Sequence, residues 1–114
     1  MQLTVGQDPH RFEITTVTSS SLTVSMAARG DLDLATSPLL LAALLGAIED
    51  NAPQVLELDL SHVAFLDARG VSALLRAYLA AKAIGCRIRL VRPAGHVRRV
   101  LDITGVLAVC ELVE

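Results

Sequence analysis

Apolar and polar residues alternate near the start of the chain, which predicts a β-hairpin. The two-residue period holds over residues 12–16, breaks at the polar segment 18–21, and resumes over residues 22–26. A half-buried strand has this period because successive side chains point to opposite faces of a sheet. Two such runs joined by a short polar segment predict an N-terminal hairpin.

A helix is predicted to follow, with Ser37 as a hydroxyl cap and Pro38 at the first helical position. Leu39 and Leu40 are either core residues or contacts of a homodimer, and the sequence leaves both alternatives open. Proline at position 53 ends the helical pattern. The predicted buried stripe consists of Leu41, Leu44, Leu45 and Ile48.

The rest of the chain alternates strands with helices. Residues 55–60 have few polar side chains, as expected of a central strand buried on both faces, and Ser61 is expected to form a turn. Asp67 can cap a second helix, which Gly85 is placed to end. This helix is predicted to bury Val71, Leu74, Leu75, Tyr78 and Leu79, and the following elements are a strand at 87–91, a helix at 96–103 and a strand at 107–113.

This order predicts an α/β fold with a mixed sheet of four to five strands and helices packed on it. The chain has 114 residues, of which 53% are apolar and 19% charged, so we expect one folded domain over residues 1–114. The apolar stretch 39–48 is too short to cross a bilayer, and the N-terminus lacks a signal-peptide layout. We therefore expect a cytoplasmic protein without membrane insertion. Cys86 and Cys110 have apolar neighbours and are interpreted as buried thiols.

The net charge of −2 hides an asymmetry along the chain. Nine acidic residues precede Ala68 against two arginines, whereas residues 69–99 carry eight basic residues and no acid. The second half should therefore present a basic face. Nucleic-acid binding is disfavoured, because only three aromatic side chains are present and all fit apolar stripes.

Catalysis is disfavoured as well. The nearest assembly of reactive groups is Asp59, His62 and Asp67 around one strand, and carboxylates at a strand end are common. The chain has no glycine-rich phosphate loop and no metal-ligand spacing, and its three histidines are far apart in sequence. We therefore expect a binding protein without metal or cofactor.

Three segments together resemble one known family. Residues 56–75, with the sequence LELDLSHVAFLDARGVSALL, resemble the signature of STAS domains. In that signature an apolar strand leads to an aspartate and to a glycine that opens a helix. Residues 30–33 and 98–105 fit the same family in the same order. An isolated single-domain anti-sigma factor antagonist is the likeness that fits this chain best.

The resemblance implies a phosphorylation switch. Such an antagonist binds an anti-sigma factor that is also a serine kinase, which frees a sigma factor until a serine beside the signature aspartate is phosphorylated. The position matching that serine is Ala68, so the resemblance implies a form that binds constitutively. An alternative within the same fold is an accessory subunit bound to the ATPase of a lipid-type ABC transporter. A sensor of a small ligand ranks below both, because no convergent polar cluster is visible.

The candidate partner-binding residues lie at the start of the second helix. Asp67 is interpreted mainly as the helix cap and Gly70 as a close-packing residue. Arg69 opposes the helix dipole, which indicates a role other than helix stability. Ser72 is the hydroxyl on this face that could receive phosphate instead. The predicted flat face consists of Arg69, Ser72, Ala73, Arg76, Ala80 and Ala83, and the candidate site of Asp67, Ala68, Arg69, Gly70, Ser72 and Arg76.

Overall fold

A computed structural model describes residues 12–20 and 22–114 of the chain, which form one five-stranded sheet with four helices. The strands lie in the order β1-β2-β3-β4-β5. β1 is antiparallel to β2, and all the other neighbouring pairs are parallel. The elements are β1 Glu13–Ser19, β2 Thr23–Leu32, α1 Ser37–Asn51, β3 Val55–Leu66, α2 Ala68–Ala83, β4 Arg87–Val91, α3 Gly95–Ile103, α4 Val106–Val109 and β5 Glu111–Val113.

The predicted hairpin and the mixed sheet are confirmed. β1 and β2 pair from Glu13 with Arg29 to Ser19 with Val24, and a bulge interrupts the register between Thr16 and Thr18. The Ser20 hydroxyl oxygen closes the turn by accepting hydrogen bonds from the amides of residues 22 and 23, at 3.2 and 3.0 Å. The polar break in the sequence pattern therefore marks the turn itself.

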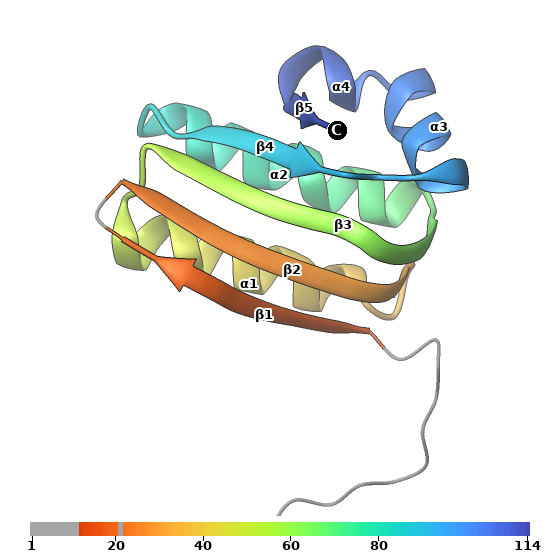
Figure 1. Ribbon diagram of the computed structural model, residues 1–114, viewed down its shortest axis with the longest axis horizontal. Coiled ribbons are helices and arrows are strands. Elements are labelled where there is room, and N and C mark those ends of the chain that lie inside the picture. The colour runs from red at the N-terminus through yellow and green to blue at the C-terminus, as the bar shows by residue number, and fades with distance from the viewer. Residues whose placement is uncertain (1–11, 21) are drawn as a thin grey trace, which may run out of the picture.

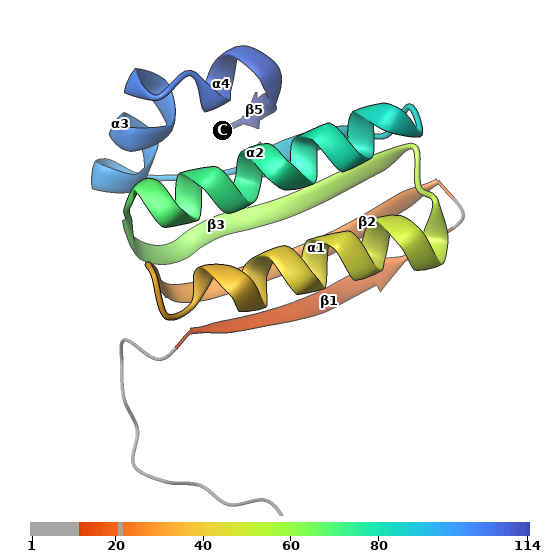
Figure 2. The same ribbon diagram turned by 180° about the vertical axis from the view of Figure 1, so that it is seen from behind.

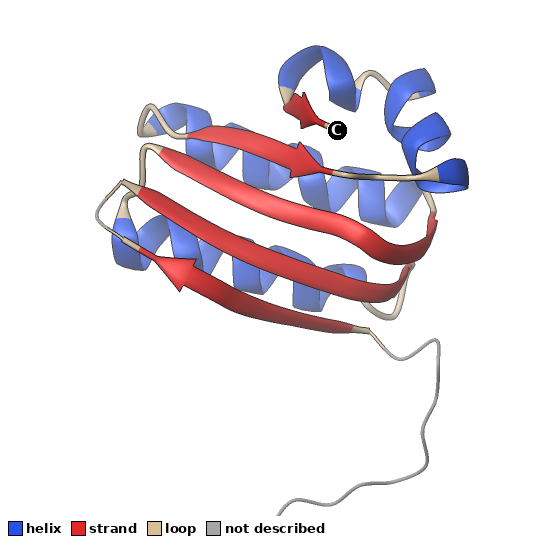
Figure 3. Cartoon of the chain, viewed as in Figure 1, coloured by secondary structure: helices blue, strands red, loops and turns tan. Residues whose placement is uncertain are grey.

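The two long helices lie side by side on the same face of the sheet (Figures 1 and 2). Each follows a parallel strand, α1 after β2 and α2 after β3, so both helices start at the same edge of the sheet (Figure 2). Among the described residues no helix covers the opposite face of β2 and β3 (Figure 3). None of the helices in the described part combines the length and apolar character that a bilayer crossing needs.

The start of α1 differs from the prediction. Thr36 is the N-cap residue and Ser37 is already helical and buried, so the prediction that the Ser37 hydroxyl caps the helix is wrong. The Thr36 hydroxyl instead donates to the Asp31 carbonyl oxygen at 2.7 Å and accepts from the Asp33 amide at 2.9 Å. The buried stripe includes Leu40, which is therefore a core residue, whereas Leu39 is 56% exposed.

β3 is longer than the six residues predicted for it. The turn expected at Ser61 is absent, because β2 extends to Leu32 and offers pairing partners to β3 as far as Leu66. The register shifts twice, between Ala27 and Arg29 and between Gly30 and Asp31 of β2, and each time β3 accommodates one extra residue. The strand thereby continues with Val63 and Leu66 turned into the core. The extra length carries the strand directly to the Asp67 cap.

The C-terminal segment is the third departure from the prediction. The strand predicted over residues 107–113 is reduced to Glu111–Val113, because residues 106–109 form a single helical turn that buries Val106. Gly105, with a φ of +83°, reverses the chain between α3 and this turn. Cys86 and Cys110 are buried and unpaired, as predicted, and burial raises the pKa of the Cys110 thiol to about 11.

Candidate functional site

The junction between β3 and α2 is held by the side chain of Asp67. Its Oδ1 atom accepts hydrogen bonds from the amides of Arg69 at 2.9 Å and Gly70 at 3.2 Å. Its own amide donates to the Leu32 carbonyl oxygen at 3.1 Å, which ties the junction to the end of β2. The predicted N-cap is confirmed, and it satisfies amides that the helix itself leaves without acceptors.

A glycine is required at position 70 because the first turn of α2 lies very close to the ends of β2 and β3. A Cβ atom at this position would overlap Cδ1 of Leu66 and lie 3.0 Å from Cβ and 3.1 Å from the carbonyl oxygen of Leu32. Because the Leu32 carbonyl belongs to the backbone of β2, it cannot move aside like a side chain. Gly70 therefore sets how closely the first turn of α2 approaches the sheet, as its predicted close-packing role requires.

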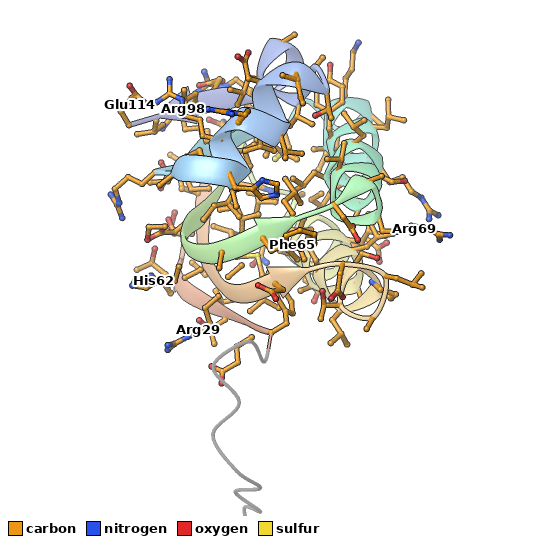
Figure 4. The ribbon with its side chains drawn as sticks, turned by 90° about the vertical axis from the view of Figure 1, so that its right-hand side faces the viewer. Arg29, His62, Phe65, Arg69, Arg98 and Glu114 are labelled. Atoms are coloured by element: carbon orange, nitrogen blue, oxygen red, sulfur yellow. The ribbon has the colours of Figure 1, made fainter. Side chains whose placement is uncertain are left out.

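The residues between these two anchors point outward. Ala68 and Arg69 are exposed, and Figure 4 shows the Arg69 side chain projecting on the helix side of the molecule. Any group added to the side chain at position 68 would face solvent or a bound partner. Asp67 and Gly70 thus hold the first turn of α2 on the side that faces the sheet, and the outer side of this turn is exposed.

A shallow groove of about 200 Å³ runs between the start of α1 and the first half of α2. Its α2 wall brings together three of the predicted site residues, Arg69, Ser72 and Arg76. Its other wall is apolar and was not predicted from the sequence, because it depends on how α1 packs against α2. Its apolar residues are Leu34, Pro38 and Leu41, and the buried Ser37 also lines it.

The prediction of an exposed flat face on α2 is wrong for one of its residues. Ala73 is 4% exposed and forms the floor of the groove, because α2 packs against α1 through small side chains. The apolar stripe of α2 is rotated accordingly: Ala77 and Ala81 are buried, whereas Leu79, predicted as core, is 63% exposed. Ala80 is partly buried, and Arg69, Ser72 and Arg76 remain exposed.

The groove carries charge of one sign. Within residues 12–20 and 22–114, neither Arg69 nor Arg76 forms an ion pair. By contrast, two arginines on β4 and just after it are paired with acids, although Arg29 on β2 has no ion pair within the described residues. Arg89 lies 3.3 Å from Glu57 and 3.2 Å from Glu111, and Arg92 lies 2.9 Å from Asp59.

The groups weighed as a catalytic assembly do not converge. Asp59 and Asp67 are separated by about 25 Å of extended strand. Partial burial alone would raise the pKa of Asp59, but hydrogen bonds from Ser61 and the Arg92 guanidinium outweigh it and lower the pKa. The His62 ring lies 3.1 Å from the Ser61 hydroxyl and projects on the face opposite Arg69 (Figure 4).

An aromatic contact beside the junction was missed by the sequence analysis. Phe65, interpreted as a core residue, is 41% exposed and stacks on the His96 ring, with centroids 5.3 Å apart and planes at 9°. Nε2 of His96 lies 3.3 Å from the Leu66 carbonyl oxygen, within reach of a hydrogen bond. Because α3 is distant in sequence from the end of β3, no local pattern indicates this contact.

Comparison with known proteins gives consistent matches. The family model described as "Mlab, STAS domain" matches residues 15–114. A crystal structure of an anti-sigma factor antagonist from Mycobacterium paratuberculosis has 26% identity, covers 93% of this chain and 88% of its own, and has a TM-score of 0.76. A search of curated proteins gives no match.

The Bacillus protein SpoIIAA matches in two states. The anti-sigma factor antagonist in its unphosphorylated form has 24% identity, covers 91% of this chain and 89% of its own, and has a TM-score of 0.74. The phosphorylated form, described as a Bacillus cell fate determinant, has 23% identity, 91% and 92% coverage, and a TM-score of 0.67. These two likenesses show the fold.

Proposed function

Because this chain belongs to the STAS domain family, we propose that it acts as an anti-sigma factor antagonist. In this role it binds an anti-sigma factor of the serine-kinase type and releases a sigma factor, by binding rather than by catalysis. The named functions of the solved relatives support this role. They do not favour the alternative, an accessory subunit of a lipid-type ABC transporter. A partner of this kind places the chain in the cytoplasm.

The observation that carries the proposal is the open first turn of α2. Asp67 and Gly70 hold this turn in place, and Ala68 and Arg69 are exposed above them. A partner that docks here would contact Ala68 and Arg69 directly and reach Ser72 and Arg76 along the groove. The proposed binding site therefore consists of Asp67, Ala68, Arg69, Gly70, Ser72 and Arg76.

The proposed antagonist is not controlled by phosphorylation of the serine that the STAS signature places after the aspartate. The SpoIIAA relative exists in a phosphorylated and an unphosphorylated form. The STAS signature in this sequence implies that the corresponding position is Ala68, which cannot accept a phosphate. A phosphate at the start of a helix is compatible with the helix dipole, so its effect on a partner would be steric and electrostatic. The methyl group of Ala68 keeps the surface small and uncharged, which supports constitutive binding.

The test is a pull-down from cytoplasmic extract with mass spectrometry, using the wild-type chain, Ala68→Asp and Ala68→Ser as baits. We expect the wild type to capture a kinase-type anti-sigma factor and Ala68→Asp to lose it, since a carboxylate mimics the blocking charge. With ATP, Ala68→Ser should lose the partner while the wild type keeps it. Capture of a transporter ATPase in place of an anti-sigma factor would reject the antagonist role.

The absence of a switch is tested separately by incubating the wild-type chain with the captured kinase and ATP. We expect no phosphate on the wild type and a single phosphate on Ala68→Ser. Phosphate on Ser72 or Ser61 of the wild type would overturn constitutive binding while leaving the antagonist role intact. Both hydroxyls are accessible to a kinase, since both residues are exposed.

Self-association is a separate proposal. Leu39 remains a candidate contact of a homodimer, because its side chain is exposed on α1, whereas Leu40 is in the core. Light scattering after size exclusion should give a dimer that Leu39→Glu converts to a monomer. A monomeric wild-type chain would exclude this use of Leu39.

A further inference from the structure

The groove between α1 and α2 combines unpaired positive charge with an apolar wall. We propose that it accepts an amphipathic helix of the protein partner, with two acidic residues two turns apart beside an apolar stripe. This inference rests on the proposed function, because it describes the element of the partner that the site recognises. It adds what the family assignment does not state, namely the chemistry of the docking segment.

Charge complementarity is the first argument. Arg69 and Arg76 are the charged residues that line the groove, and residues 37–48 of α1 contain no ionisable side chain. The nearby carboxylates of Asp33 and Asp67 are already engaged by backbone amides at the starts of the two helices. Both helices begin at this edge of the sheet, so their dipoles add to the positive potential (Figure 2). An acidic segment of a partner would therefore complement the charge of this groove.

The spacing of the two arginines is the second argument. Arg69 and Arg76 lie two helical turns apart, which corresponds to about 10.5 Å along α2. A helix that lies along the groove repeats its side chains at the same interval, so acidic residues at positions i and i+7 would face both guanidinium groups. Between them, Ala73 forms a floor without a bulky side chain and allows a close approach.

The opposite wall fits the apolar stripe of such a helix. Leu34 is 63% exposed, and Pro38 and Leu41 continue the apolar surface along α1. An exposed leucine at the rim of a charged groove is covered when an amphipathic helix docks, which removes apolar surface from water. The two walls therefore match the two faces of one helix.

Other occupants fit less well. A volume of about 200 Å³ is below the roughly 300–1,000 Å³ typical of small-molecule sites. Nucleic acid would need stacking side chains, and none of the lining residues is aromatic. A second copy of this chain lacks the matching helix, because the acids of its helices are Glu49 and Asp50 on α1, which are adjacent, and Asp102 on α3.

The experiment measures binding of the captured anti-sigma factor to the wild type, Arg69→Glu, Arg76→Glu and a matched control, Arg99→Glu. Arg99 is exposed on α3 and forms no ion pair within the described residues. Each groove reversal should slow association by about tenfold and flatten its dependence on salt. The control should stay within about twofold of wild type. Thermal melts should show that all three variants fold.

The outcomes separate this inference from the proposed function. If the anti-sigma factor binds and the groove reversals behave like Arg99→Glu, the groove is not the docking site and the antagonist role stands. If no anti-sigma factor is captured, the antagonist role fails, and a stapled peptide helix with glutamates at i and i+7 flanking leucines becomes the probe. Amide shifts over residues 34–41 and 69–76 would support the groove, and binding elsewhere or none would overturn it.

Discussion

The two junctions from strand to helix in this molecule share one contact, an aspartate side chain that accepts hydrogen bonds from following backbone amides, but Asp67 caps α2 directly whereas Asp33 closes a turn before α1. Each places an aspartate directly after a buried leucine at the end of a parallel strand, Asp33 after Leu32 and Asp67 after Leu66. Each aspartate accepts hydrogen bonds from the amides two and three residues later. At the second junction the helix begins at once with Ala68, whereas at the first an additional turn precedes α1.

The additional turn before α1 gives the two junctions different surfaces. The immediate start of α2 brings its first turn against both strand ends, which requires Gly70 and leaves Ala68 and Arg69 on the outer side. The additional turn before α1 carries Leu34 to the surface, where it forms the apolar wall of the groove. One motif repeated in two neighbouring βα units therefore builds both walls of a single binding surface.

The largest effect should come from closing the space under α2 with Gly70→Ala. The new methyl group would overlap the Leu66 side chain and press on the Leu32 backbone, so the helix must move away from the sheet. We expect the free energy of unfolding to fall by about 2–3 kcal/mol, in the range for overpacked sites. Urea denaturation followed by circular dichroism measures this change.

Gly46→Ala is the matched control for that variant. Gly46 lies in the middle of α1, and a Cβ atom there would meet nothing within 4 Å. The same chemical change should therefore raise the free energy of unfolding by about 0.5–1 kcal/mol through helix propensity. A loss of stability of similar size in both variants would contradict the steric role of Gly70.

The next largest effect should follow loss of the second cap in Asp67→Ala. Within the described part of the chain the amides of Arg69 and Gly70 have no other acceptor, and the Gly70 amide is partly buried. We expect a loss of about 1 kcal/mol. Asp67→Asn should retain most of the stability, since an asparagine oxygen caps nearly as well. Equal losses in both variants would show that charge, and not the hydrogen bonds, stabilises this junction.

The same change at the first junction should cost less. In Asp33→Ala the Thr36 amide keeps the Asp33 carbonyl oxygen as acceptor at 3.3 Å, and the Thr36 hydroxyl still accepts from the Asp33 amide. The amide of Ala35 loses its acceptor, but it is exposed and can donate to water instead. We therefore expect a loss of about 0.5 kcal/mol, at the lower end for helix caps. Chemical denaturation of the two alanine variants side by side checks the order.

The comparison also shows how far sequence patterns reach. The cap at Asp67 follows from local spacing, because a helix start involves residues that are neighbours in sequence. A glycine in the first helical turn also indicates close packing, although its contact with Leu32 appears only in three dimensions. At the first junction the same reasoning placed the cap on Ser37, because the hydroxyls of Thr36 and Ser37 both fit a cap pattern and only the backbone path separates them. The single helical turn at Val106 was missed because its apolar residues also fit a strand.

Features that depend on packing between elements were not predictable. The stripe of α2 was assigned to large apolar residues, yet the surface against α1 consists of small ones such as Ala73 and Ala77. Small residues bring helices close together, and a period alone does not reveal which side of a helix meets a neighbour. For the same reason the Leu34 wall of the groove and the stack of Phe65 on His96 appear only in three dimensions.

The smallest effect is expected from the charge that distinguishes the two helix starts. Arg69 lies in the first turn of α2, where its positive charge opposes the helix dipole, whereas the first turn of α1 carries no charge. Arg69→Gln should raise the free energy of unfolding by about 0.3 kcal/mol, the lower end of such effects at an exposed site. Arg69→Glu should raise it slightly more. Denaturation at low and high salt measures both, and the gain should shrink as salt screens the dipole. Because these variants are expected to weaken partner binding while stabilising the fold, a variant that loses both would show that Arg69 has a structural role that its exposed position does not indicate.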